Sequence, residues 1–291
     1  MVKLEKESPC KVNLLLNILG KRPDGFHELE TVMYPISVFD RLSFSRGGKG
    51  IELTCSDRGL PTDSRNLVYR AAEAFFRATG IKEGVRIQLE KKIPMAAGLG
   101  GGSGNAAVTL LGLKELFDRP LGAERIQEIA ASIGSDVPFF LQRKPALAVE
   151  RGEKIKSLDS FPALHGRAFL LVHPGFGIST PWAYQQLARF PDALNGQRGR
   201  AQKLISLLRK DKLQNAGHEF YNSLEAPALE KYPLLALFQE FLREKGAEAA
   251  LMSGSGSSTF AIVKSRAAAE ELAEKFKGKF GNNNWIAVVQ A

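Results

Sequence analysis

Cysteine is scarce in this chain of 291 residues, because only Cys10 and Cys55 are present. Two cysteines are too few for a disulfide scaffold or a four-cysteine zinc site. Long apolar runs are also missing, and none approaches the roughly 20 residues that a membrane-spanning helix needs. The basic, then apolar N-terminus is interrupted by glutamates and asparagines, and no small-residue cleavage site follows it. We therefore expect a cytoplasmic protein without a membrane partner.

Positive charge is in excess, because the chain has 40 Lys and Arg against 31 Asp and Glu, which gives a formal net charge of +9. That balance suits either nucleic acid or small anionic substrates. The basic residues are dispersed, and no basic tail or stripe with interleaved aromatics appears. With 44% hydrophobic residues, the chain can bury a sizeable core. Composition thus predicts a globular protein but leaves its partner undecided.

Strand-like and helix-like patterns alternate along the chain and predict an α+β fold. Residues 11–19 alternate as a strand, and the Pro-Asp-Gly turn that follows predicts a hairpin returning through 30–36. Residues 180–245 are mostly helical, apart from a polar loop expected at 191–200. We place a coarse domain boundary near 150–165, giving domains 1–155 and 156–291. Further strands are expected at 38–45, 51–55, 85–93, 146–155, 167–175 and 284–290, and residues 248–263 are expected to form a strand, a second Gly/Ser turn and another strand. Further helices are expected at 65–79, 106–117, 126–133 and 265–276.

The stretch PMAAGLGGGSGNAAVTLL, residues 94–111, is rich in glycine and opens an amphipathic helix. A P-loop is excluded because no Gly-Lys pair is followed by Ser or Thr. A dinucleotide fold is rejected because the region where its acidic residue should end a second strand reads as loop and helix. Two interpretations of the stretch remain: a phosphate-binding site at the helix N-terminus, or a glycine-rich connector without a ligand. The residues alone favour the phosphate only modestly.

Four ordered segments carry a resemblance to a known family. PMAAGLGGGSGNAA resembles the glycine signature of the GHMP kinases, which phosphorylate hydroxyl groups of small molecules. PCKVNLLLNILGKRPDGFHELETV, GSDVPFFL and MSGSGSSTFAI resemble motifs of the branch that acts on 4-diphosphocytidyl-2-C-methyl-D-erythritol. The resemblance implies two α+β domains, the first similar to domain 2 of ribosomal protein S5 and the second ferredoxin-like, with the active site in the cleft between them.

The resemblance also implies roles for individual residues. Asp136 would be the base for the substrate hydroxyl, and Lys11 would stabilise the developing negative charge. Without the motif, Asp136 would read as a turn cap and Lys11 as a solvated strand charge. The residues implied for ATP are Pro94, Met95, Ala96, Ala97, Gly98, Leu99, Gly100, Gly101, Gly102, Ser103, Gly104, Asn66 and Lys91. Those implied for the substrate are Asn13, Phe26, His27, Tyr184, Gly254 and Ser255.

Several alternatives stay open at individual positions. Phe26 and Tyr184 could be core aromatics, and Trp182 is the local rival of Tyr184. Asn66 could be a helix cap and Lys91 a surface charge. Gly104 stands where the family often has a second serine. The segment YNSLE, residues 221–225, stands where Asn-Asp-Leu/Phe-Glu is usual, which leaves its role undefined.

The expected activity is therefore transfer of the γ-phosphate of ATP to the 2-hydroxyl of 4-diphosphocytidyl-2-C-methyl-D-erythritol, in the non-mevalonate isoprenoid pathway. Mg²⁺ is expected with ATP, although no protein ligand is assigned apart from the Ser103 hydroxyl as one option. The expected partners are these small molecules and not nucleic acid. A homoserine or mevalonate kinase is the first alternative, and a non-catalytic nucleotide-binding or nucleic-acid-binding module is the second.

Overall fold

The computed structural model describes residues 3–118, 121–210 and 213–291. These residues form two compact units, each assembled from segments that are separated in the sequence. Unit 1 contains the chain up to Cys10, Val38–Ile93 and Gly100–Arg143. Unit 2 contains Lys11–Ser37, Pro94–Leu99 and Lys144–Ala291. The extents 1–155 and 156–291 for two domains stay a prediction.

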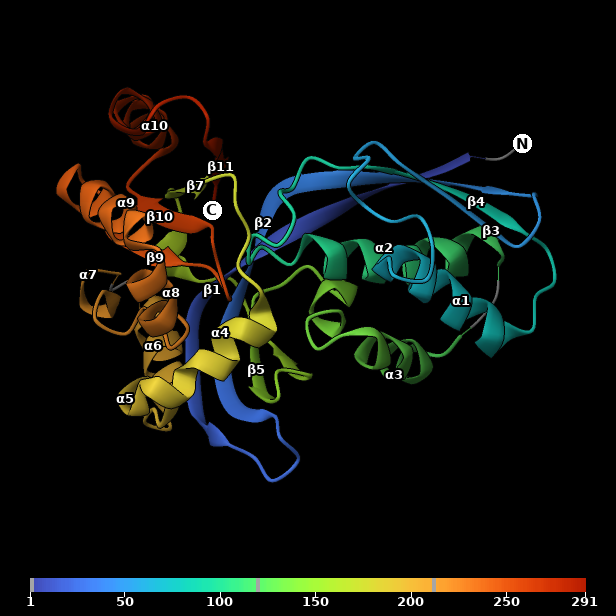
Figure 1. Cartoon of the computed structure of the whole chain (residues 1–291), viewed down its shortest axis with the longest axis horizontal. Helices are drawn as coiled ribbons and strands as arrows, with labels where there is room; N and C mark the ends of the chain where they lie inside the picture. Colours follow the sequence, from blue (N-terminus) through green and yellow to red (C-terminus); the bar gives the residue numbers. More distant parts are fainter. Residues whose placement is uncertain (1–2, 119–120, 211–212) are drawn as a thin grey trace. The chain divides into compact units, whose positions relative to one another are not determined.

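Two long antiparallel strands, β1 (Lys3–Lys21) and β2 (His27–Arg46), contribute to both units (Figure 1). The strands expected separately at 30–36 and 38–45 are one continuous strand, β2. The turn between β1 and β2 is the predicted Pro-Asp-Gly turn, in which Gly25 has φ +84° and the Arg22 N–H donates to the Phe26 carbonyl at 2.8 Å. The sheet order is β3-β4-β2-β1-β8, and the remaining members are β3 (Ile51–Cys55), β4 (Val85–Glu90), β5 (Ala146–Glu150), β6 (Lys154–Ser157) and β8 (Tyr221–Asn222).

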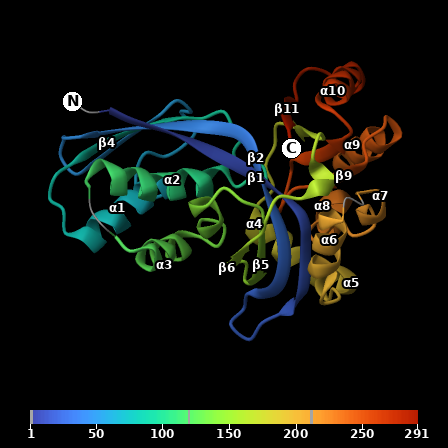
Figure 2. The ribbon, with the colours of Figure 1, turned by 180° about the vertical axis from the view of Figure 1, so that it is seen from behind.

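In unit 1, helices α1 (Leu67–Thr79) and α2 (Gly101–Leu116) lie against the sheet, and α3 (Ala123–Ile133) packs beside them (Figure 2). Because α2 is buried along most of its length, small residues set how closely it approaches its neighbours. A Cβ added at Gly112 would lie 2.7 Å from the Phe44 ring of β2. The predicted end of α3 is confirmed, since the Gly134 N–H donates to the Ala130 carbonyl.

In unit 2, a second antiparallel sheet has the order β11-β7-β10-β9. Its central strands are buried along their whole length, as strands covered on both faces must be. Helices α9 (Pro233–Glu244) and α10 (Arg266–Phe280) pack on it and on each other, with the ring centroids of Phe238 from α9 and Phe276 from α10 at 4.7 Å. The strands are β7 (Ala168–His173), β9 (Ala249–Met252), β10 (Thr259–Val263) and β11 (Trp285–Gln290).

Short helices connect the strands of unit 2, and one of them corrects the sequence prediction. Residues 191–200 were expected as a polar loop, but Pro191–Leu194 forms the one-turn helix α5, with Pro191 at its first position where a proline is well tolerated. The buried Glu30 carboxylate accepts a hydrogen bond at 3.0 Å from the Ala201 N–H, in the first turn of the next helix. The other helices of this region are α4 (Thr180–Gln186), α6 (Arg200–Arg209), α7 (Leu213–Ala216) and α8 (Glu225–Lys231).

Among the described residues, each helix is too short or too polar to cross a bilayer. The elements described here confirm the expected mixture of strands and helices. The glycine stretch also opens a helix, α2, as expected.

Gly104 provides the first test, because α2 lies against β1 at this residue. A Cβ at Gly104 would lie 2.7 Å from the Pro9 carbonyl oxygen, whereas a Cβ at Gly102 would find only an ordinary 3.6 Å contact with Leu67. We expect Gly104→Ala to lower the free energy of unfolding by about 1–3 kcal/mol through overpacking. The control Gly102→Ala should leave it unchanged or slightly raise it, because alanine has the higher helix propensity. Chemical denaturation measures both, and equal effects of the two substitutions would contradict this packing.

Candidate active site

The tip of the β1–β2 hairpin places His27 against an aromatic residue from a distant part of the chain. The rings of His27 and Tyr184 lie 5.1 Å apart between centroids, a direct aromatic contact. Burial lowers the pKa of His27, and the nearby Lys21 charge lowers it further, so the imidazole is neutral at neutral pH. Phe26 is 53% exposed, with the Arg151 guanidinium 4.8 Å above its ring. Phe26 is therefore not a core aromatic.

Trp182, the rival of Tyr184 on the same helix, has different neighbours. Its ring packs edge-on against Tyr232, and the Lys231 ammonium lies 4.3 Å from the ring centroid. Tyr184, two residues on, is the one that reaches His27. Of the two aromatics, only Tyr184 shares a contact with another predicted site residue.

Lys11 and Asn13 project from the same face of β1 and are both almost fully buried, at 3% and 2% exposure. The Lys11 ammonium donates to the Asn13 Oδ1 atom, and the Asn13 Nδ2 atom donates to the Thr31 hydroxyl at 2.8 Å. Lys11 is therefore not a solvated edge charge. A buried ammonium held by hydrogen bonds is a preorganised positive charge, and such a charge acts more strongly than one in water.

The segment Pro94–Leu99 approaches the glycine-serine turn 253–258 more closely than side chains would allow. A Cβ at Gly98, where φ is +74°, would lie only 1.9 Å from the Ser253 carbonyl oxygen. The Ser253 hydroxyl donates to the Gly98 carbonyl at 2.9 Å, and the Ser258 N–H donates to the Ala97 carbonyl at 3.1 Å. Two sequence motifs predicted to bind different ligands thus share one backbone framework in unit 2.

Asn13 also belongs to this framework. A Cβ at Gly254 would lie 3.3 Å from the Asn13 Oδ1 atom. The Asn13 N–H itself donates to the Ser253 hydroxyl at 3.4 Å. Lys11, Asn13 and Gly254, which the sequence predicted separately, therefore lie together. Ser255 is 8% exposed, and its hydroxyl is 2.8 Å from that of Thr180, the first residue of α4.

The YNSLE segment supplies three side chains whose contacts the sequence did not predict. Asn222 donates from its Nδ2 atom to the carbonyls of Met252 and Gly254, both at 2.8 Å. Ser223 accepts a hydrogen bond from the Ile18 N–H at 2.9 Å. Glu225 accepts one from the Met252 N–H at 2.7 Å. The segment departs from the usual family pattern, and the groups that it contacts are distant in the sequence, so the sequence did not define its role.

In unit 1, α2 begins at a position without a side-chain cap. Gly100 is its N-cap residue, in the left-handed conformation, and the first turn has no acidic residue. The N–H groups of this turn have no partner within the helix, so together with the helix dipole they favour an anion. Gly102 is exposed and Ser103 half-buried. This is the arrangement expected for a phosphate.

Lys91 lies near the start of α2, and its side chain is buried and paired, while its contact with ATP stays a prediction. Its ammonium would be 3.3 Å from a Cβ at Gly101, and it forms an ion pair with the fully buried Asp40. The Asp40 carboxylate also accepts hydrogen bonds from Asn105 at 2.9 Å and from the Ile93 N–H at 2.9 Å. The surface-charge alternative for Lys91 is wrong. Asp40 was missed because nothing in the sequence indicated its partners.

Asn66 is a helix cap. Its Oδ1 atom accepts from the Val68 N–H at 2.9 Å at the start of α1, and its Nδ2 atom donates to the Pro61 carbonyl at 2.8 Å. The amide group is therefore used on both sides, and a contact of this side chain with ATP stays a prediction.

Asp136 lies half-buried in the turn between α3 and a short 3₁₀ helix, η1 (Pro138–Leu141). The Val137 N–H closes this turn on the Gly134 carbonyl at 3.0 Å. The Phe140 ring fixes η1 against the start of α2, since it lies 3.4 Å from a Cβ placed at Gly104. Within unit 1, the turn that carries Asp136 is thus anchored to the glycine-rich helix.

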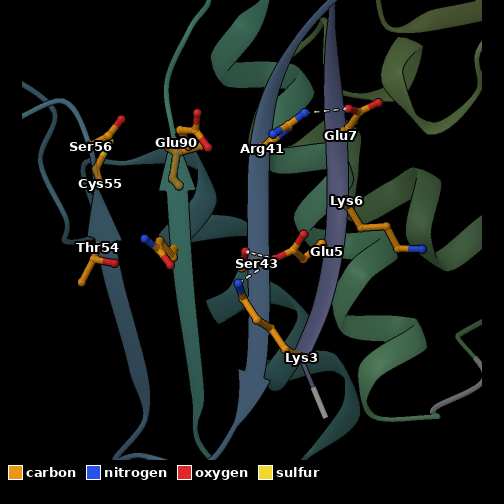
Figure 3. Close-up of a pocket in the computed structure, with 12 residues that line it drawn as sticks. Lys3, Glu5, Lys6, Glu7, Arg41, Ser43, Thr54, Cys55, Ser56 and Glu90 are labelled. Atoms are coloured by element: carbon orange, nitrogen blue, oxygen red, sulfur yellow. Dashed lines mark hydrogen bonds and ion pairs between the residues drawn. The ribbon is translucent and has the colours of Figure 1, made fainter. Parts of the chain in front are cut away.

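The hollow drawn in Figure 3 is a different part of unit 1. It lies over β1 to β4 and is lined by oppositely charged pairs such as Arg41 with Glu7. None of the predicted site residues lines it. The described residues also contain no group of three or more His, Cys, Asp or Glu side chains placed to hold a metal ion.

Comparisons with known proteins identify the family. The GHMP kinases N terminal domain matches residues 66–144, and the GHMP kinases C terminal domain matches residues 202–283. The 4-diphosphocytidyl-2-C-methyl-D-erythritol kinase of Citrifermentans bemidjiense is 38% identical over 289 residues, covering 99% of this chain and 98% of that protein. The chain belongs to the GHMP kinases.

Solved structures of GHMP kinases share the fold. A crystal structure of 4-(cytidine 5'-diphospho)-2C-methyl-D-erythritol kinase is 33% identical, with a TM-score of 0.82 and coverage of 99% of this chain and 100% of that one. The homoserine kinase of Cytophaga hutchinsonii is 18% identical, with a TM-score of 0.73 over 99% and 93% of the two chains, which shows the shared fold alone. The GHMP kinase fold predicted from four motifs is confirmed.

Glu225 provides the second test, through the pH dependence of stability in this GHMP kinase. Burial raises the pKa of Glu225 to about 7, although hydrogen bonds from Met252 and Gln239 and the Arg243 charge oppose the shift. Between pH 4.5 and 7 the folded state therefore binds more protons than the unfolded state. Protonated Glu225 therefore makes its full contribution to the free energy of unfolding below pH 4.5. This contribution is lost as the pH rises through 7, and the total loss is about 3 kcal/mol.

We expect Glu225→Gln, which keeps an acceptor for Met252 but cannot ionise, to gain stability relative to the parent protein as the pH rises from 5 to 8. Denaturation midpoints across that range measure the difference. Glu244→Gln, at an exposed position near the end of α9, is the control. Its denaturation midpoint should change with pH in the same way as that of the parent protein. Parallel curves for Glu225→Gln would show that Glu225 does not titrate in this range.

Proposed function

We propose that this GHMP kinase transfers the γ-phosphate of ATP to the 2-hydroxyl of 4-diphosphocytidyl-2-C-methyl-D-erythritol. The observation that carries the choice of substrate is the contact between His27 and Tyr184, at 5.1 Å between ring centroids. The family resemblance implies both for the cytidine group, and they come from segments far apart in the sequence. Relatives of nearly the same length carry the name of this activity, which supports the same choice.

The proposed donor site is the start of α2, where the exposed Gly102 and the half-buried Ser103 offer backbone N–H groups to the phosphates of ATP, and the buried Gly101 adjoins them. Lys91 with Asp40 holds the neighbouring backbone at the end of β4. The remaining residues of Pro94–Leu99 form the loop that leads into the helix. ATP is the substrate that a kinase of this family uses.

Asp136 is the proposed base for the substrate hydroxyl, and Lys11 the proposed stabiliser of the negative charge that develops on it. A carboxylate can accept the hydroxyl proton, and a buried ammonium lowers the energy of the alkoxide-like oxygen. Phosphoryl transfer depends mostly on positioning and charge stabilisation, so a carboxylate and an ammonium group are sufficient to assist the reaction. Asn13 would hydrogen-bond the substrate, and the N–H groups of Gly254 and Ser255 would face its phosphates.

Mg²⁺ is proposed with ATP, where it would neutralise phosphate charge. Mg²⁺ keeps several waters and binds mainly through phosphate oxygens, so it does not need a cluster of carboxylates. The half-exposed Ser103 hydroxyl, in the first turn of α2, fits as one oxygen ligand.

The substrate assignment is tested by assaying the purified protein with ATP and 4-diphosphocytidyl-2-C-methyl-D-erythritol, mevalonate or homoserine. We expect turnover of the cytidyl alcohol alone, because the His27–Tyr184 pair suits a base that neither other alcohol possesses. ADP release measures each reaction. Turnover of mevalonate or homoserine without the cytidyl alcohol would replace this assignment with the first alternative. A nucleotide-binding module would turn over none of the three.

The role of Asp136 is tested by Asp136→Asn, which keeps the size of the side chain but cannot accept the proton. We expect kcat to fall at least about a hundredfold, the lower range for general base catalysis. ATP affinity, measured by calorimetry, should be retained. Asp159→Asn, at an exposed position in unit 2, is the control and should keep full activity. A kcat for Asp136→Asn within a few fold of the parent would remove Asp136 from the chemistry.

A further inference from the structure

Asn222 is buried at 1% exposure, and each polar group of its side chain is used. The Nδ2 atom donates to the carbonyl oxygens of Met252 and Gly254, both at 2.8 Å, and the Oδ1 atom accepts from the Leu224 N–H at 2.9 Å. Asn222 therefore holds two carbonyls of the turn that follows β9.

The two carbonyl contacts determine where the next N–H group points. The peptide bond between Gly254 and Ser255 is trans, so its C=O and N–H point in opposite directions. Because Asn222 draws the Gly254 carbonyl toward itself, the Ser255 N–H points away from Asn222. Ser255 is 8% exposed, and its N–H has no hydrogen-bond acceptor within residues 3–118, 121–210 and 213–291. A backbone N–H without a protein acceptor can donate to an anionic oxygen of a ligand.

Other contacts fix the rest of the turn independently of Asn222. The Gly256 N–H donates to the Ser253 carbonyl at 3.0 Å, and the Ser255 hydroxyl contacts that of Thr180. The hydroxyls of Ser257 and Ser258 lie 3.3 and 3.4 Å from the His173 Nδ1 atom. These contacts hold the groups around the Gly254–Ser255 peptide, and Asn222 holds the carbonyl of that peptide itself, so the direction of the Ser255 N–H is set before any ligand binds.

We infer that Asn222 is a positioning residue that directs the Ser255 N–H toward a phosphate oxygen of the nucleoside diphosphate group of the substrate. The inference rests on the proposed function and adds the residue that orients the donor. Asn222 itself does not touch the ligand. A donor that is already oriented loses little entropy on binding, so its contribution appears in affinity for the diphosphate group rather than in the chemical step.

The test compares Asn222→Asp and Asn222→Ala with Ser223→Ala. Asn222→Asp keeps the size and the acceptor for Leu224 but loses both donors. Ser223 is the neighbouring buried residue of the same segment, and its hydroxyl accepts from Ile18 in β1 rather than from the turn. Calorimetry with CDP, which contains the diphosphate but no reacting hydroxyl, reports binding without activity. Steady-state kinetics separates KM from kcat.

We expect the Kd for CDP and the KM for the cytidyl alcohol to rise on the order of tenfold in both Asn222 variants, as the loss of a hydrogen bond to a charged group predicts. The KM for ATP should not change, and Ser223→Ala should keep the parent Kd for CDP. A purely structural role would lower stability in the Asn222 and Ser223 variants alike without this selective loss. Equal CDP affinities across the three variants would overturn the inference.

A measurement on the parent protein covers the case in which the Asn222 variants do not fold. The Ser255 amide signal in an NMR spectrum should shift on saturation with CDP, and its hydrogen exchange should slow. An unmoved Ser255 signal with CDP bound would overturn the role of this donor. If the parent protein binds no CDP and does not phosphorylate the cytidyl alcohol, the proposed function fails instead, which is a distinguishable result.

Discussion

The close approach of Gly98 to the Ser253 carbonyl is the constraint on which unit 2 depends. A Cβ at Gly98 would lie 1.9 Å from that oxygen, and the φ of +74° also disfavours any residue other than glycine. Two backbone segments can meet this closely only when no side chain separates them. The segment that leads into α2 and the turn after β9 are therefore one connected framework, tied further by the Ser253 hydroxyl bond to the Gly98 carbonyl.

The buried side chains of Asn13 and Asn222 hold this framework, each through several hydrogen bonds. Asn13 bonds to Lys11, Thr31 and Ser253, so β1 is joined to the same turn. In unit 1, Asp40 similarly gathers Lys91, Asn105 and the Ile93 N–H. A fully bonded network inside a protein is rigid, because breaking one bond leaves a buried group unsatisfied. Both units thus place their polar groups before a ligand arrives, as phosphoryl transfer requires.

Much of the fold followed from local sequence signals, whereas most of the polar network did not. The Pro-Asp-Gly turn, the end of α3 at Gly134 and the helix after the glycine run were all readable, because each depends on residues within a few positions. The burial of Lys11 was not readable, since it depends on what packs over β1. The helix α5 was missed because its four residues form only a single turn, which is too short to show a helical pattern.

The candidate site shows the same division. Motif matches identified Asn13, His27, Tyr184 and Gly254, which the structure brings together in pairs. They could not identify Asp40 or Glu225, because the partners of a buried carboxylate are chosen by the fold and not by its neighbours in sequence. Lys91 was expected near phosphate. Its ion pair with Asp40 could not be predicted, because the fold brings together two residues that are distant in the sequence.

Ser223 shows how a departure from the family pattern can be accommodated. The family usually has an aspartate at this position, and a carboxylate there would be a buried charge beside the Ile18 N–H. Serine supplies the acceptor for that N–H through its hydroxyl, at 2.9 Å, without introducing a charge. Because burying an unpaired carboxylate is costly, a neutral acceptor of similar reach preserves the link between β1 and the segment that holds the turn. The departure therefore leaves the contacts of the neighbouring Asn222 and Glu225 with the turn in place, and the geometry of the turn does not depend on an aspartate at residue 223.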